Sequence, residues 1–330
     1  MKRIALLLAG SLVGLSTVVS GHAGASPQTA VSRDLPGTHC TPFPANNVWN
    51  TPVNTLPVNK RSAEWVKHIG VRYQGQPVHT HPDFGPSYGA QPVPYGIPIT
   101  YVSGSHPLVH VRFRYASESD KVKYPLGNDT KIEGGRHADG DRHAIVVDKA
   151  TCRDYETWLT VHDKSGWTAG SGATWSLNSN HLRPAGWTSA DAAGLPILPG
   201  LLRWNEVKAG HVDHAIRFTA PITSKHYIWP ARHEAGSKAS LAYPPMGARF
   251  RLKASYHLKG ASKYTKVVLT AMKTYGLILA DNGSPWYFQG EQSTHWPGQM
   301  IAQLKEIPAS AFVAVDESGL RVSANSAQAR

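Results

Sequence analysis

Short runs of β-branched and aromatic residues, most of them bounded by Gly or Pro, constrain the fold of this chain more than any other feature of its sequence. Such runs are typical of strands, because Pro excludes helix interiors and branched or aromatic side chains pack well on a pleated surface. Most are five to eight residues long. We predict strands at 97–102, 108–115, 143–147, 155–161, 214–219, 226–229 and 248–253.

Helical patterns are fewer. Residues 62–69 and 264–275 carry apolar side chains at helical spacing, and each segment is followed by a Gly, which commonly ends a helix. A third helix is expected after Thr294. Strands with a few peripheral helices predict a mainly β fold, an antiparallel β-sandwich or jelly-roll-like arrangement.

The first 25 residues have the pattern of an export signal. Lys2 and Arg3 precede an apolar run from Ile4 to Val19, and Ala23-Gly24-Ala25 is a typical cleavage site. We expect a secreted or periplasmic protein that is soluble after cleavage near Ala25, since no later run approaches the roughly 20 apolar residues of a membrane span.

The remaining chain is expected to form a single domain. Residues 26–38 form a flexible lead, residues 39–316 a β-rich domain, and residues 317–330 a loose, polar tail. Cys40 and Cys152 are the two cysteines, and an even number in an exported chain predicts that they form a disulfide. We expect a monomer.

The charge of the chain indicates the class of its partner. The formal net charge is +12, and loss of Lys2 and Arg3 with the signal lowers it to +10. The cations are spread singly along the chain, without a basic run or a nucleic-acid motif. An anionic polysaccharide is therefore favoured over nucleic acid as a partner.

Six motifs are long enough to be specific. They are 82–85 (Pro-Asp-Phe-Gly), 140–143 (Gly-Asp-Arg-His), 186–200, 229–233 (Trp-Pro-Ala-Arg-His), 244–253 and 280–284 (Ala-Asp-Asn-Gly-Ser). Together they resemble a group of exported bacterial proteins over most of the mature chain. The resemblance implies export and one shared architecture; no catalytic residue is taken from it.

Ionisable and aromatic residues are densest between Arg203 and Arg249. Glycan cleavage requires paired carboxyl groups, or a base and an acid at a uronate C5 proton. Carboxyl groups near turns or strand ends are Asp83, Glu133, Asp141, Glu206, Asp213 and Asp281. We predict Glu206 and Asp213 as the acid/base pair, because an aromatic or imidazole neighbour raises a carboxyl pKa or shares its proton.

Other residues complete this hypothesis. His214, His143 and Asp141 assist or replace the acid/base pair, and in a lyase His214 or His143 would take the C5 proton while Arg232 neutralises the uronate. The residues expected to bind substrate are Arg232, His233, Trp204, Trp229, Tyr227, Trp286 and Asp83. Core packing is an equal alternative for the aromatic residues.

Two other classes stay open. One is a non-catalytic protein that binds a glycan or a cell wall through the same aromatic residues. The other is a metalloenzyme that uses distant histidines such as His143, His214 and His233, although most of the 17 histidines must be surface or packing residues. No cofactor is predicted. The sequence therefore predicts an exported enzyme that cleaves a polysaccharide, more specifically an acidic one, by hydrolysis or β-elimination.

Overall fold

A computed structural model describes residues 33–86 and 93–330 of the chain. The protein is mainly β, with 28% strand against 14% helix, which confirms the predicted class. The predicted signal peptide and most of the predicted lead lie outside the described residues, within which no helix is long and apolar enough to cross a membrane.

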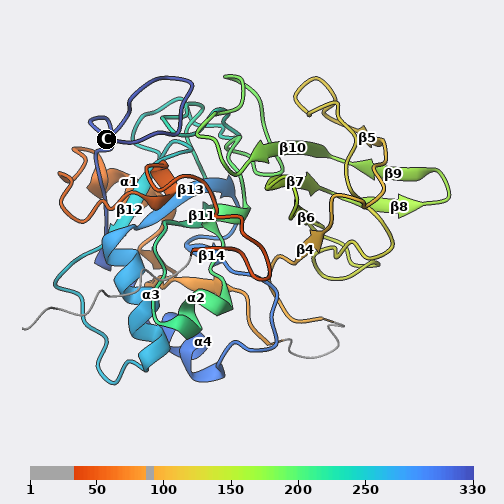
Figure 1. The fold of residues 1–330 in the computed structure, drawn as a ribbon. Coiled ribbons are helices and arrows are strands. Elements are labelled where there is room, and N and C mark those ends of the chain that lie inside the picture. The colour runs from red at the N-terminus through yellow and green to blue at the C-terminus, as the bar shows by residue number, and fades with distance from the viewer. Residues whose placement is uncertain (1–32, 87–92) are drawn as a thin grey trace, which may run out of the picture. The chain divides into compact units, whose positions relative to one another are not determined.

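The largest sheet has six strands in the order β15–β12–β13–β11–β14–β3. Its strands β12, β13, β11 and β14 are labelled in Figure 1. In that order the strands are Phe312–Ala314, Arg249–Leu252, Leu277–Asn282, Ile216–Ala220, Tyr287–Gln289 and His81–Asp83. Phe218, Phe250 and Phe288 are fully buried in the main core, and helix α3 (Lys263–Thr274) adds Val268 and Met272 to it. The apolar residues of these strands therefore hold the sheet against its helices.

A second sheet has four strands in the order β10–β7–β6–β4. They are Ser171–Ser176, Arg153–Trp158, Ala144–Asp148 and Ile99–Val102. Strands β6 and β7 form the antiparallel hairpin that the 147–152 connection predicts. A separate core cluster joins this sheet to a three-stranded sheet, β5–β9–β8 (Val111–Phe113, Gly166–Ala169 and Val161–Asp163).

Strand pairing is mixed, unlike the antiparallel arrangement predicted from the sequence. Both larger sheets contain parallel pairs, β11 with β13 and β3 with β14 in the first and β4 with β6 in the second. Runs of buried residues such as 144–147 and 216–220 are typical of strands that are covered on both faces. The sandwich or jelly-roll arrangement stays a prediction.

Helix positions agree closely with the sequence patterns. Helix α1 spans Ser62–Ile69, α3 ends one residue before the predicted boundary, and α4 (Gly298–Leu304) begins directly after Pro297. Residues 226–229 do not form the predicted strand. Tyr227 makes a single bridge to Met246, and Pro230 has no backbone N–H with which to extend a ladder. The short helix α2 (Trp204–Ala209) was not predicted from the sequence.

Cys40 and Cys152 form the predicted disulfide, with their Cα atoms 5.3 Å apart. It links the start of the described chain to the β6–β7 hairpin. Some of residues 317–330, the segment predicted to form a loose tail, contact the rest of the domain. The buried Glu317 carboxylate lies 2.9 Å from the fully buried guanidinium of Arg249, and Ala327 donates a backbone hydrogen bond to Asn180. Burial of Leu320 and Ala329 explains why this polar tail is ordered.

Candidate functional site

One face of the six-stranded sheet is polar because its strands alternate. Phe218 of β11 pairs with Phe288 of β14, and both point into the core. Their chain neighbours Arg217, Thr219, Tyr287 and Gln289 therefore point to the opposite face. The parallel pairing of β3 with β14 sets Asp83 beside Gln289, whose side-chain amide donates to it at 3.3 Å. Alternation thus places polar side chains of β3, β11 and β14 on the same face of the sheet.

A β-bulge adds Asp281 to this face. The register between β11 and β13 pairs Phe218 with Leu279 and then Thr219 with Asp281, so that Ala280 is the extra residue. Without the bulge Ala280 would face Thr219 and the Asp281 side chain would point to the other face. The bulge thereby aims Asp281 toward the polar side.

These side chains line a cavity of about 300 Å³. The segment before β6 completes it with Asp141 and His143, and a loop adds Glu133. Its lining is Asp83, Ile97, Glu133, Asp141, His143, Arg217, Thr219, Asp281, Asn282, Gly283, Ser284, Tyr287 and Gln289. Four carboxyl groups and two basic side chains line this cavity, so acidic residues predominate in it although the chain is basic.

His143 is nearly fully buried and forms a close pair with Glu133. Its Nδ1 lies 2.6 Å from the Glu133 carboxylate, whereas no polar atom among the described residues contacts its buried Nε2. Burial lowers the pKa of His143, but the charge and hydrogen bond of Glu133 outweigh it and raise the pKa to about 9. The imidazole is therefore protonated at neutral pH.

Arg142 fixes the direction of this segment. It has a positive φ of 50°, and its guanidinium donates hydrogen bonds to the backbone carbonyls of Thr160 and Arg136, both at 2.9 Å. This turn sets the flanking Asp141 and His143 side chains into the lining of the cavity.

Arg217 links two carboxyl groups. It binds the fully buried Asp191 in a bidentate pair, with N–O distances of 2.9 and 2.8 Å, and its Nη2 lies 3.8 Å from Asp281. Burial and the charge of Asp191 raise the pKa of Asp281 to about 8, against the opposing effect of Arg217. Since 24% of the Asp281 side chain is exposed, it is a carboxylic acid that solvent or a ligand can reach at neutral pH.

A second cavity, of about 400 Å³, adjoins the first. Asp141, Asp281 and Asn282 line both cavities. The second cavity also contains Tyr115 and Trp158, whose rings stack with centroids 6.2 Å apart. The two cavities therefore adjoin, with two carboxyl groups among the residues that they share, and together they are called the groove.

The two junction carboxyl groups have different settings. Asp141 is exposed, and its Oδ1 accepts a hydrogen bond of 3.0 Å from the indole N–H of Trp158. Asp281 is partly buried beside Asp191 and carries a proton at neutral pH. One exposed carboxylate and one protonated carboxyl are the combination that general acid/base catalysis requires.

Glu206, predicted as half of the acid/base pair, lies in a buried ionic network and not among the residues that line either cavity. Its carboxylate contacts both Arg203 and His214, the latter at 3.1 Å. Burial alone would raise its pKa, but Arg203 and His214 lower it to about 2. His214 is occupied on its other nitrogen by the carbonyl of Ala215. This network stabilises α2 against β11 and leaves no carboxyl group free for acid catalysis.

Asp213 and Arg232 also lie outside the groove. Asp213 pairs with His211 at 2.9 Å. The guanidinium of Arg232 donates to the backbone carbonyls of Arg183 and Ala324 and to the side chain of Asn325. It therefore fixes the C-terminal segment. His233, by contrast, lines the second cavity, with its Nδ1 2.8 Å from the carbonyl of Ala192.

The four aromatic residues predicted to bind substrate pack against the protein. Trp286 is fully buried and stacks on Phe218 and Phe312. Trp204 contacts Tyr264 and Trp296, while Trp229 and Tyr227 are partly buried against the main core. The core-packing alternative accounts for their positions.

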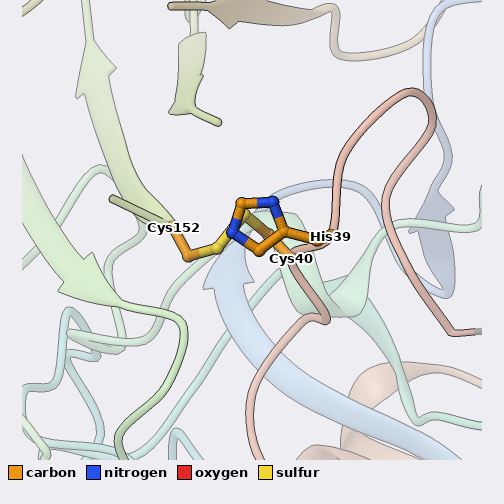
Figure 2. Close-up of side chains that lie close together, drawn as sticks. All are labelled: His39, Cys40 and Cys152. Atoms are coloured by element: carbon orange, nitrogen blue, oxygen red, sulfur yellow. A yellow bond between two sulfur atoms is a disulfide. The ribbon is translucent and has the colours of Figure 1, made fainter. Parts of the chain in front are cut away.

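Potential metal ligands converge at one place within the described residues, at His39, Cys40 and Cys152. Figure 2 shows the imidazole of His39 beside the bond between the two sulfur atoms. A disulfide offers no thiolate, so this group lacks the ligands that zinc prefers. His143, His214 and His233 have the separate environments described above and do not form a ligand set.

Sequence reasoning missed several groove residues. Arg217 and Thr219 carried a signal, since polar residues at alternating positions of an apolar strand indicate one polar face. No such signal in the sequence marks Asp191 or Trp158. Asp191 pairs with Arg217, 26 residues away, and Trp158 bonds to Asp141, 17 residues away.

No protein-family model matches the chain, and neither a curated protein nor a solved structure shows significant similarity to it. The function must be argued from the groove itself.

Proposed function

We propose that this protein is an exported glycoside hydrolase whose active site is the junction of the two cavities. The observation that carries the proposal is that Asp141 and Asp281, from different segments, line both compartments of one groove. A polysaccharide bound along the groove would have sugar rings in each compartment and a glycosidic bond between the two carboxyl groups. That is the arrangement glycosidases require.

The two carboxyl groups have distinct roles. Asp281, protonated at neutral pH, donates its proton to the glycosidic oxygen as the bond to the leaving sugar breaks. Asp141, held by Trp158, is the carboxylate that acts on the opposite side, either on a water molecule or on the anomeric carbon. Arg217 keeps Asp281 in place through the shared pair with Asp191.

Several observations favour hydrolysis over β-elimination. A lyase needs a neutral base, but His143 is protonated at neutral pH because of Glu133. Arg232, the cation predicted to neutralise the uronate, lies outside the groove, and its guanidinium is bound to backbone carbonyls. The acidic lining of the groove further favours a neutral or amino sugar over the acidic glycan expected from net charge.

Tyr115 and Trp158 supply the binding surface for a sugar ring in the second cavity. Stacking of sugar on aromatic faces is compatible with their partial exposure and with the 29° angle between their ring planes. The same pair supports a second candidate, a glycan-binding protein without catalysis. Export of either protein is supported by the N-terminal signal pattern and by the disulfide.

A panel of soluble glycans separates these functions. Incubation with neutral, amino-sugar and uronic polymers would be followed by reducing ends and by the ultraviolet absorbance of unsaturated uronates. Hydrolysis predicts new reducing ends from a neutral or amino-sugar polymer without the absorbance. Elimination would produce both signals from a uronic polymer, and binding without new ends would support the non-catalytic candidate.

A further inference from the structure

A third cavity lies outside the proposed catalytic groove. Its volume is about 630 Å³, within the usual range of ligand sites. It lies at strands β7 and β10 and the segments 117–122 and 179–187, and it shares no lining residue with the other two cavities. Its lining includes Asp120, Lys121, Arg153, His181, Arg183 and Trp187.

Arg183 forms the rigid part of its wall. The buried guanidinium donates to the carbonyls of Thr188 and Glu118 and to the carboxylate of Asp120, each at 2.8 Å. It also lies over the rings of Trp175 and Trp187, 5.7 and 5.6 Å from their centroids. Trp187 is only partly buried, so the cavity offers an aromatic surface whose orientation is set by a fixed cation.

The charge of this cavity is opposite to that of the groove. Lys121, Arg153 and His181 are exposed in its lining, and none of them belongs to an ion pair of the described residues. The single acid in the lining, Asp120, is bound to Arg183. The charges that remain for a ligand are therefore positive.

We propose that this cavity is a non-catalytic binding site for an anionic polysaccharide. A sugar ring stacks on Trp187, while carboxylates on neighbouring sugars pair with Lys121 and Arg153. Hydroxyl groups of the lining serines supply hydrogen-bond partners for sugar hydroxyls. A single aromatic surface among hydroxyl groups fits a glycan better than a nucleic acid strand, which requires successive stacking positions.

This site gives the basic chain a place to bind an anionic polymer outside its acidic groove. The anionic polymer expected from the net charge is bound at the cavity of Lys121 and Arg153, where it anchors the protein. The proposal does not depend on hydrolysis in the groove, because no residue is shared by the two sites.

The test measures binding of the full chain to soluble polygalacturonate, with dextran as a neutral polymer. We expect Lys121→Ala/Arg153→Ala to bind polygalacturonate about tenfold more weakly, the sum expected for two exposed charge contacts. The matched control is Lys225→Ala/Lys259→Ala, which removes two exposed lysines that line none of the three cavities and should bind as the wild type does.

Trp187→Ala, with Trp187→Phe as a conservative partner, tests the stacking surface. Alanine should weaken binding and phenylalanine should restore most of it, with thermal unfolding used to confirm that both variants fold. Absence of binding to polygalacturonate, or equal losses in the two double variants, would overturn the proposal. Tighter binding of a single-stranded oligonucleotide at the same residues would overturn the assignment to a polysaccharide.

Discussion

Asp141 and Asp281, 140 positions apart in the sequence, line the same two adjoining cavities. The first lies in the segment before strand β6 of the four-stranded sheet, and the second is the bulge-shifted residue near the end of β13 in the six-stranded sheet. The groove thus depends on contact between the two sheets, and each carboxyl group owes its direction to a local departure from regular geometry.

The activity should decrease as the pH rises through about 8. Asp281 donates a proton only in its acid form, and burial together with Asp191 raises its pKa to about 8. Asp191→Asn removes the negative neighbour and should move this limb of the pH profile to lower pH, since less repulsion favours the carboxylate. The measurement is kcat against pH; an unchanged limb would argue that another group is the acid.

The pair of His143 and Glu133 should stabilise the fold at neutral pH and lose this effect in alkali. The pKa of His143 is raised from 6.5 to about 9 on folding, so its contribution is complete below pH 6.5 and is lost as the pH rises through 9. The shift corresponds to roughly 3 kcal/mol.

The check is the free energy of urea unfolding of wild type and Glu133→Gln at several pH values. Their difference should shrink between pH 6.5 and 9. A difference that is constant over this range would contradict the assignment of the shift to Glu133.

Glu206→Gln should reduce stability without removing the chemistry. Arg203 and His214 lower the pKa of Glu206 to about 2, and this stabilisation, present above its usual pKa of 4.5, disappears as the pH falls through 2. Loss of the charge leaves the buried guanidinium of Arg203 without its partner, which we expect to cost about 3 kcal/mol. Activity per folded molecule, measured below the melting transition, should stay near that of wild type. A loss of over a hundredfold would show that Glu206 takes part in catalysis.

Removal of the disulfide should lower stability by about 3 to 5 kcal/mol, because it closes a loop with a sequence separation of 112. Cys40→Ser/Cys152→Ser and the wild type should be compared by urea unfolding, with the reduced wild type as control. If the variant were as stable as the oxidised wild type, the link between the N-terminal segment and the β6–β7 hairpin would have no energetic role.

The sequence predicts the fold class, the disulfide and the helices around residues 62–69 and 264–275 well, because these depend on local patterns. It predicts strand pairing poorly. Parallel pairs such as β11 with β13 join segments separated by a helix, and neither strand carries a local signal of its partner.

The candidate site is predictable in part, because some of its residues lie next to segments with clear local patterns. Asp141 and His143 precede a clear strand, and Asp281 precedes an Asn-Gly turn, so their positions at strand ends can be deduced. Glu206 was predicted to be catalytic because it is an acid near aromatic residues. Arg203, three residues before it at the N-cap of α2, forms an ion pair with it. The sequence spacing shows that Arg203 and Glu206 can form an ion pair. It does not show that both side chains are buried and therefore stay paired.

The most direct test of the proposed active site compares three matched variants, Asp281→Asn, Asp141→Asn and Asp139→Asn, on the polymer that the wild type cleaves. Asp139 is an exposed acid two residues from Asp141 that lines neither cavity of the groove. The account predicts that the first two variants bind the polymer but release reducing ends about 10² to 10⁴ times more slowly, whereas Asp139→Asn equals the wild type. Cleavage at the wild-type rate by both Asp281→Asn and Asp141→Asn would contradict it.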